Sequence, residues 1–335
     1  MSDSLHRGDF TSQTDTDIPV PRYYGSALVE LAGEREEIVA LSGDLTPSTE
    51  CDLFRDAFPD RFFIPGIAEA NMVGMAAGMA RAGDIPFVHS FAVFLSRRSF
   101  DQVALQIAYP RTNVKLIGFL PGLTTPLGVS HQAIEDIALM RALPNMMIIE
   151  PAGAQQVGAA VRAIADHNGP VYLRLPRVNV PLDPSVESMD LVPGKAQILR
   201  DGDDAVIFAC GHMVAQALIA ATELSAKGIH ISVANVHTLK PLDRNFVAAQ
   251  ATRTGCVITA ENHSVIGGLG SAVAETLMEA GIAAKFGRIG IGDVFGEGGS
   301  TPYLFDKYGL SARHIEKLAI RLLGGPAAVA ADITG

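Results

Sequence analysis

The stretch from Gly66 to Ala80 reads GIAEANMVGMAAGMA, an almost wholly apolar, glycine- and alanine-rich segment with one carboxylate, Glu69, near its head. Water strongly favours an ionised carboxylate, so a Glu in such surroundings should hold a proton more readily, find a partner, or both. A carboxyl group of that kind can donate a proton to a basic ring nitrogen at neutral pH. The alternative is that Glu69 only complements the positive end of a buried helix.

Helical stretches and short apolar strands alternate along the chain on both sides of this segment. Short, continuous apolar strands between helices indicate a parallel sheet with helices on both faces. The sequence therefore predicts an α/β fold with two doubly wound domains, the first built on a mostly parallel sheet and the second smaller. In the first domain we expect helices over residues 25–32, 71–81, 100–108, 133–141 and 154–167, and strands over 38–42, 86–90, 114–119, 146–150 and 171–175. In the second we expect strands over 205–210, 229–235, 256–261 and 285–290, and helices over 213–227, 244–253, 270–280 and 312–323.

A connection that contains Pro, Asp and Ser separates the two alternations and is typical of a linker. The polar start and the end of the chain lack either pattern. We therefore expect a disordered tail over residues 1–18, a first domain over 19–181, a linker over 182–194, a second domain over 195–324 and a flexible tail over 325–335.

Composition excludes several classes of partner. The net charge of -10 and the pI near 5.3 argue against nucleic acid or an anionic membrane as the main partner, because neither is attracted by that field. The first 17 residues lack an apolar leader, and no later run has the roughly 18 apolar residues that span a bilayer. We expect a cytoplasmic protein. The three cysteines are far apart and have no CxxC spacing, which predicts buried thiols and neither a disulfide framework nor a zinc site.

Five segments in order carry a resemblance to a known family. After Glu69 and its small-residue helix come SFAVF at 90–94 and GVSHQAIED at 128–136; the second domain adds TLKPLD at 238–243 and ENHSVIGGLG at 261–270. Together they resemble the transketolase family of thiamine diphosphate enzymes over roughly residues 21–323. The resemblance implies a pyrimidine-binding domain over 19–181 and a transketolase C-terminal-type domain over 195–324.

The resemblance also implies a role for Glu69 and for two aromatic residues. Glu69 would donate a proton to N1′ of the cofactor's aminopyrimidine ring, which makes the exocyclic nitrogen of the same ring the base that activates the cofactor. Phe94 would stack on the ring and exclude water, with Phe91 as its neighbour. The alternative is that both phenylalanines are core residues, the commoner fate of aromatics after a strand.

His131 lies at the expected start of the 133–141 helix, with Ser130 as a candidate N-cap and Glu135 in its first turn. The resemblance implies that His131 reaches the substrate, bonds a hydroxyl or carbonyl oxygen of the donor and assists proton transfer. The alternative is a capping or surface histidine.

Three further residues resemble positions close to the cofactor or to a substrate phosphate. Arg177 ends a strand and resembles a phosphate-binding arginine, a role that suits a guanidinium fork, although a surface ion pair is the alternative. Ser48 resembles a second phosphate contact. Asp44 resembles an acidic position near the cofactor, but it could equally cap the turn that follows.

The magnesium ligands of the family are missing from this chain. Enzymes of this type hold the diphosphate through GDG followed by an Asn, and no such arrangement occurs here. We therefore expect thiamine diphosphate and Mg²⁺ as cofactors, but with the metal ligands on a separate, N-terminal transketolase subunit, in an assembly of two copies of each chain. This chain would be the second subunit of a split transketolase and would correspond to the C-terminal half of an undivided enzyme.

The expected reaction is transfer of a two-carbon ketol unit from a ketose to an aldehyde. We expect the ketose to be phosphorylated. Phe119 and Leu127 stand where sugar-specific members carry a His and an Asp, so ordinary pentose phosphates are in doubt. Arg97 and Arg98 are either solvated or offer charge to an acidic acceptor. Two other functions stay open. One is decarboxylating acyl transfer, similar to deoxyxylulose phosphate synthase or to the β chain of 2-oxo acid dehydrogenases, and the other is a non-catalytic assembly subunit.

The second domain contains two features that suggest chemistry and for which we predict packing roles. His263 is expected to help the domains pack. The GGLG turn at 267–270 lacks the rest of a phosphate-binding motif, which favours close packing of a helix on a strand.

Overall fold

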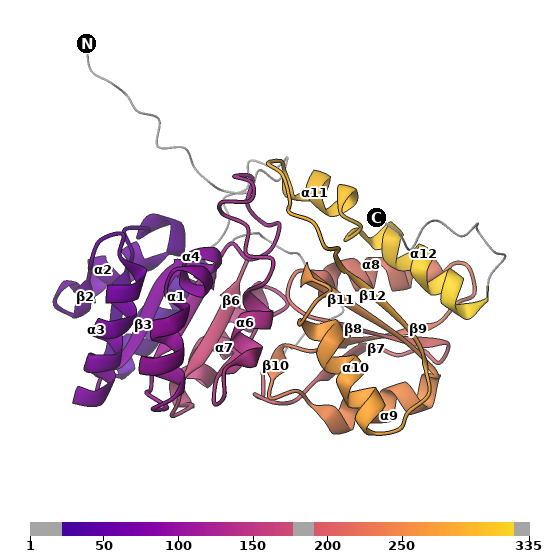
Figure 1. The fold of residues 1–335 in the computed structure, drawn as a ribbon, viewed down its shortest axis with the longest axis horizontal. Helices are drawn as coiled ribbons and strands as arrows, with labels where there is room; N and C mark the ends of the chain where they lie inside the picture. The colour runs from indigo at the N-terminus through magenta and orange to yellow at the C-terminus, as the bar shows by residue number, and fades with distance from the viewer. Residues whose placement is uncertain (1–21, 177–190, 325–335) are drawn as a thin grey trace, which may run out of the picture.

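The computed structural model describes residues 22–176 and 191–324 and divides them between two α/β domains (Figure 1). The predicted tails and most of the predicted linker lie outside these ranges, so those boundaries stay predictions. The predicted fold class is confirmed: each sheet is parallel except for one antiparallel strand at an edge.

The first domain has a seven-stranded sheet with the strand order β10-β5-β6-β4-β3-β1-β2. Its strands are β1 (Ile38–Ser42), β2 (Phe62–Phe63), β3 (Ile85–Phe91), β4 (Lys115–Phe119), β5 (Met147–Ile149), β6 (Val171–Leu175) and β10 (Thr238–Lys240). Its helices are α1 (Tyr23–Glu34), α2 (Cys51–Ala57), α3 (Glu69–Ala82), α4 (Ala92–Arg97), α5 (Phe100–Gln102), α6 (Asp136–Ala142) and α7 (Ala154–Asp166), with 3-10 turns at Pro47–Thr49 and Pro59–Arg61 and a π-helical turn at Val103–Ala108.

Helices cover both faces of this sheet, because alternate residues of each strand face opposite sides. On one face α1, α2 and α7 pack on Phe87, Ile117 and Leu173. On the other face α3, α6 and the π-helical turn pack on Val88 and Leu116.

The second domain has a five-stranded sheet with the order β12-β11-β8-β9-β7. The strands are β7 (Gln197–Arg200), β8 (Ala205–Ala209), β9 (Ile231–Asn235), β11 (Cys256–Ser264) and β12 (Lys285–Ile291). The helices are α8 (Met213–Ser225), α9 (Arg244–Thr254), α10 (Leu269–Glu279), α11 (Thr301–Lys307) and α12 (Ala312–Leu323). Helices α8, α11 and α12 pack on one face of the sheet, and α9 and α10 on the other.

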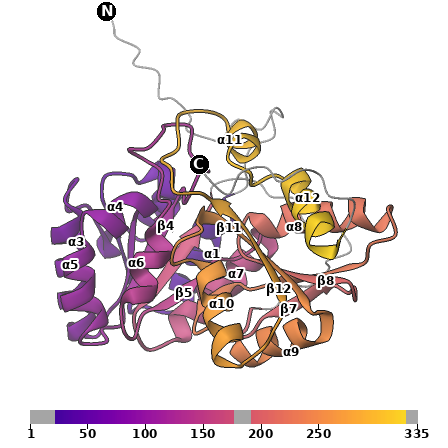
Figure 2. The same ribbon diagram turned by 45° about the vertical axis from the view of Figure 1, so that its right-hand side comes forward.

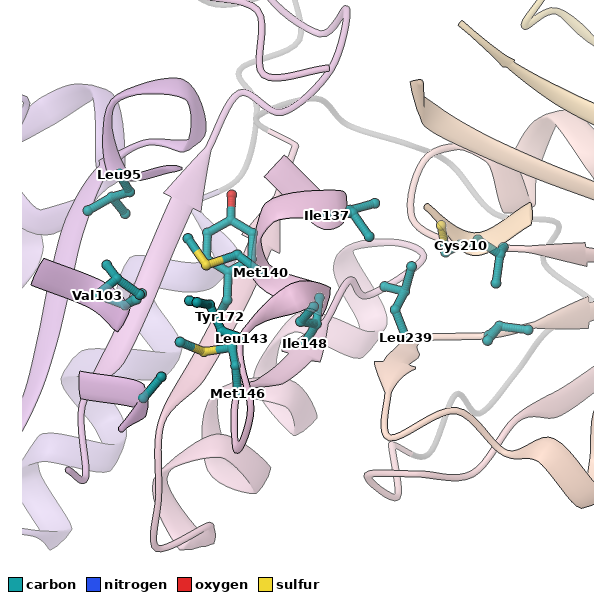
Figure 3. Close-up of a cluster of buried hydrophobic side chains, with 14 of the residues drawn as sticks. Leu95, Val103, Ile137, Met140, Leu143, Met146, Ile148, Tyr172, Cys210 and Leu239 are labelled. Carbon is teal, nitrogen blue, oxygen red and sulfur yellow. The ribbon is translucent and has the colours of Figure 1, made fainter. Parts of the chain in front are cut away.

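The two domains share a β-sheet as well as an interface. Strand β10 belongs to the second domain in sequence but pairs antiparallel with β5, placing Thr238 opposite Ile149. One apolar cluster runs from α6 and β5 of the first domain to Cys210 and Leu239 of the second (Figure 3). The segment before α11 also reaches the first domain near its 120–135 loop (Figure 2).

Two predicted helices differ from the structure. The helix expected over 100–108 is α5 followed by the π-helical turn. The helix expected from residue 133 begins only at Asp136, because Ala133 is bound elsewhere: its carbonyl accepts the Gly122 amide, and Ala133 forms a β-bridge with Pro121. Ser130 is therefore not the N-cap of this helix; Glu135 occupies that position.

Candidate active site

The candidate site lies at the carboxyl ends of β1 and β3, the edge at which open parallel sheets bind ligands. Glu69 is the first residue of α3, and its side chain is 3% exposed. Gly66, with a φ of +87° that other residues rarely adopt, turns the chain into this helix. The apolar face of α3, including Met72 and Val73, packs on the sheet and fixes the position of the carboxylate.

On one side, the Glu69 carboxylate faces the backbone of Gly43, a residue without a side chain. Gly43 follows β1, and a Cβ there would lie 3.9 Å from Glu69 Oε1 and 3.7 Å from Ser90 Oγ. Among the described residues Ser90 Oγ is buried and has no hydrogen-bond partner. An unpartnered buried hydroxyl beside a carboxylate suits a polar heterocycle better than a closed core.

Phe91 and Phe94 form the aromatic part of the site. Phe91 is the last residue of β3 and Phe94 lies in the next helix, α4; their rings stack with centroids 5.7 Å apart. Phe91 is a core residue, as the alternative held, because only 3% of it is exposed. Phe94 is half-buried.

His131 joins this aromatic pair from the 120–135 loop. Its imidazole meets Phe94 edge-on at 5.3 Å and Phe91 at 6.0 Å between ring centroids. Partial burial, and next the charge of Arg98, lower the pKa of His131, so the imidazole is neutral at physiological pH and can accept a proton. The structure thus brings His131 together with the two phenylalanines, which were predicted from a separate segment.

Arg97 holds the segment that carries His131. Its guanidinium pairs with the Glu135 carboxylate and donates to the Gln132 carbonyl at 3.2 Å. Arg97 is exposed to solvent, as one of the two alternatives for this pair expected, and it also pairs with a carboxylate of this chain.

Arg98 is a site residue whose contact with Glu69 the sequence patterns did not predict. Its Nη1 lies 3.3 Å and 3.5 Å from the two Glu69 oxygens, and its Cζ lies 3.9 Å from the centroid of the Phe94 ring. The partner expected for Glu69 is therefore Arg98. Its spacing of four residues after Phe94 was the available signal, because residues so spaced on a helix face the same side.

The other predicted residues are less closely tied to this group. Asp44 is exposed, with a left-handed φ of 61°. The 3-10 turn that follows it has no side-chain cap, so Asp44 does not cap that turn. Ser48 is half-buried in the 3-10 turn after β1, and Arg177 lies outside the described residues.

The predicted substrate-recognition positions are apolar in the structure as well. Phe119 is 1% exposed and packs edge-on against Tyr24 with ring centroids 5.4 Å apart, so it is part of the core. Leu127 lies on the 120–135 loop and is 38% exposed. Neither side chain can bond a sugar hydroxyl.

A buried ion network fixes the site against the second domain. Arg174 of β6, with no exposed surface, bonds Asp136, Glu150 and the backbone carbonyl of Asn262, each at 2.8 Å. Burial opposes ionisation of Asp136, but Arg174 holds its pKa below the usual value. The network ties β6, α6 and β11 together.

The second domain holds the 120–135 loop directly. Asn262 Oδ1 accepts the Leu123 amide at 2.9 Å, and Asn262 Nδ2 donates to the Pro121 carbonyl at 3.2 Å. Gly122 between them has a φ of +58°, and a Cβ there would lie 2.3 Å from Asn262. Farther along the loop, Gln132 Nε2 donates to the Glu297 carbonyl at 2.9 Å.

The predictions for the second domain's turn are confirmed. His263 Nε2 accepts the Ala138 amide of α6, so this histidine packs the domains together. The amides of Leu269 and Gly270 at the start of α10 donate to the Glu261 carboxylate, which leaves no phosphate cradle there. A Cβ at Gly268 would lie 1.9 Å from Glu261 Oε2.

Residues 22–176 and 191–324 hold no group of three His, Cys, Asp or Glu placed to bind a metal ion. The three cysteines are buried and free, as predicted. Within those ranges no helix has both the length and the apolar character required to cross a bilayer.

Comparison with protein families places both domains. Residues 17–183 match the transketolase pyrimidine-binding domain, and residues 194–315 match the transketolase C-terminal domain. The chain belongs to the transketolase family. This confirms the predicted resemblance, and the family implies dependence on thiamine diphosphate.

Similar proteins include split transketolases. A 6-deoxy-6-sulfo-D-fructose transketolase subunit of Clostridium sp. (strain MSTE9) is 47% identical over 88% of this chain and 92% of its own length. A solved structure described as a split-gene transketolase, inactive beta4 tetramer, is 47% identical and has a TM-score of 0.83 over 90% of this chain and 97% of that one. A 1-deoxy-D-xylulose-5-phosphate synthase of Syntrophotalea carbinolica is 38% identical over 87% of this chain, which spans 46% of that enzyme. The chain is a transketolase subunit.

Proposed function

We propose that this chain supplies the pyrimidine-binding half of a split transketolase active site, and that Glu69, Phe94 and His131 carry its chemistry. The observation that supports this best is their meeting at one sheet edge. A buried carboxylate, a half-buried aromatic ring and a neutral imidazole from three separate segments lie around Arg98.

The residues of this site fit an aminopyrimidine ring. The unpartnered Ser90 hydroxyl and the Glu69 carboxylate both lie near Gly43, which has no side chain, and both can bond a polar heterocycle. Thiamine diphosphate, when bound, supplies the carbon nucleophile that accepts the two-carbon unit. Glu69 would hold a proton at N1′ of the ring, and Phe94 would stack on the ring and keep water away.

His131 would act at the substrate end of the site. As a neutral imidazole it can take the proton from a donor hydroxyl and return it to the acceptor's carbonyl oxygen. Ser48, and Arg177 outside the described residues, would bind a substrate phosphate, and Asp44 would lie near the cofactor.

Mg²⁺ and the diphosphate would be held by a partner subunit in an α2β2 assembly. Exposed apolar side chains on and next to α3 and the π-helical turn support a protein partner; Gln106 of that turn lies against Gly74 of α3. Apolar surface of this kind on a soluble chain marks an interface. It comprises Ile64, Ile67, Met75, Leu105 and Tyr109, of which Ile67 is 71% and Tyr109 80% exposed.

The test is reconstitution with the partner subunit and substitution of the acid. We expect Glu69→Gln to lower turnover of ketol transfer by about 100-fold or more, because general acid catalysis contributes about that much. Glu223→Gln, at an exposed position on α8, is the matched control and should leave turnover unchanged. Undiminished turnover in Glu69→Gln, with the circular dichroism spectrum retained, would instead support a non-catalytic assembly subunit.

Product analysis distinguishes ketol transfer from the remaining alternative, decarboxylating acyl transfer. The synthase relative favours decarboxylating acyl transfer as second candidate. With pyruvate and hydroxypyruvate as donors, a split transketolase transfers a ketol unit from hydroxypyruvate. Carbon dioxide release from pyruvate without any ketol transfer would assign the chain to the synthase reaction.

A further inference from the structure

Arg98 makes two contacts that the proposed function assigns to the cofactor's pyrimidine ring. Its planar guanidinium lies over Phe94, with Cζ 3.9 Å from the ring centroid. The same group points Nη1 at both oxygens of Glu69, at 3.3 Å and 3.5 Å. A flat, nitrogen-bearing group on this phenyl face and against this carboxylate occupies the position of an aminopyrimidine.

Three groups of the chain lie against Phe94: Phe91 stacks on its ring, His131 meets it edge-on and Arg98 lies over it. A ligand ring that stacks where the guanidinium lies must displace it. Phe91 is 3% exposed and ends a central strand, so it is fixed. Arg98 is 50% exposed and follows the last residue of α4, a short helix. Arg98 is therefore the neighbour that can leave.

We propose that Arg98 is a displaceable occupant of the pyrimidine site: in the cofactor-free chain its guanidinium covers Phe94 and neutralises Glu69, and the cofactor binds by replacing it. The inference rests on the proposed function of Glu69 and Phe94. It adds that cofactor affinity is set by competition with a residue of this chain.

The two contacts of Arg98 are strong enough to hold it in the free chain and weak enough for a ligand to replace them. A buried carboxylate without a partner is costly, so Arg98 stabilises Glu69 until another donor arrives. A half-exposed ion pair and an exposed cation–π contact are each weak, however. Their combined loss corresponds to about a tenfold change in affinity.

The test measures ligand binding by the full-length chain without a partner subunit. The probes are 4-amino-2-methylpyrimidine, which needs only this chain's part of the site, and thiamine diphosphate with Mg²⁺, followed by calorimetry and ligand-observed NMR. The variants are Arg98→Ala and Arg98→Lys. The lysine keeps the positive charge but lacks the planar guanidinium group. Arg162→Ala is the matched control, because this arginine forms an exposed ion pair with Glu34 far from the site.

We expect the wild-type chain to bind both probes weakly, Arg98→Ala to bind the aminopyrimidine about tenfold more tightly, Arg98→Lys to fall between, and Arg162→Ala to match wild type. Adding Glu69→Gln to Arg98→Ala should abolish the gain. Because Arg98→Ala leaves Glu69 unpaired, thermal unfolding of each variant checks that it is folded, and Arg98→Lys provides a second comparison.

The outcomes separate the two hypotheses. Equal affinity in wild type and Arg98→Ala, with binding weakened by Glu69→Gln in both, would overturn displacement by Arg98 and leave the proposed function standing. An affinity that Glu69→Gln does not change, or no binding by any folded variant, would overturn both hypotheses.

Discussion

Arg98 acts on a second site residue besides Glu69, because its charge also faces His131. Partial burial and the Arg98 charge both lower the pKa of the imidazole. Departure of the guanidinium would therefore make His131 a stronger base. The pyrimidine site and the proton-transferring residue are coupled through one side chain.

We predict that Arg98→Ala raises the pKa of His131 toward the ordinary value of 6.5, since only the burial contribution remains. NMR titration of the imidazole protons measures this, with His131→Gln to assign the resonance. Arg162→Ala should leave the titration unchanged. A pKa of His131 that stays the same or falls in Arg98→Ala would contradict the assigned coupling.

The sequence predicted Glu69, Phe94 and His131 as site residues because each lies in a motif whose chemistry demands that residue type, and the structure brings them together. The sequence also drew attention to Arg98, but this residue was interpreted as solvated or as offering charge to an acidic acceptor substrate. Its role depends on the first residue of α3 meeting the last turn of α4, a tertiary contact that no local pattern encodes.

Among the elements, the 120–135 loop depends most on partners outside itself. Its backbone carbonyls and amides are bonded by Arg97, by Asn262 and by the segment before α11. These bonds hold residues 133–135 out of the helix that their sequence favours. The sequence pattern located α6 but not its start, because the competing bonds come from Gly122, from Arg97 and from the other domain. The strands β1 and β6, whose bonds lie within one sheet, were predicted with their observed bounds.

Asn262→Ala tests this dependence. We expect it to lower the free energy of unfolding by about 1–3 kcal/mol, because the Leu123 amide and the Pro121 carbonyl lose their partners while buried. Hydrogen exchange of the Leu123 amide should accelerate more than exchange in β6. Asn245→Ala, at an exposed position on α9, is the control and should change neither quantity. Exchange at Leu123 as slow as in wild type would show that the loop is held by other contacts.

For the whole molecule, buried titratable groups determine how stability depends on pH. Burial lowers the pKa of four histidines, His89, His212, His237 and His263, to about 4. The unfolded chain binds these protons near pH 6.5, so stability is lost as pH falls from 6.5 toward 4. Glu261 acts in the opposite direction, because burial raises its pKa to about 7 and the folded state then holds a proton that the unfolded chain releases above about pH 4.5. Burial also raises the pKa of Glu150.

The four histidines outweigh these two carboxyls. We predict that the free energy of unfolding, measured by urea titration, is lower at pH 5 than at pH 7 by about 2 kcal/mol. His263→Gln removes one histidine and should shrink the difference between the two pH values. Equal or greater stability at pH 5 would contradict the balance of these groups.

Strand β10 has a practical consequence for anyone who shortens this protein. A truncated chain that stops before the second domain would leave β5 with a bare row of amides and carbonyls along its flank, an arrangement that invites strand-to-strand aggregation. Expressing the two halves as independent fragments therefore requires a graft of residues 238–240 or a charged substitution on β5 to blunt that flank.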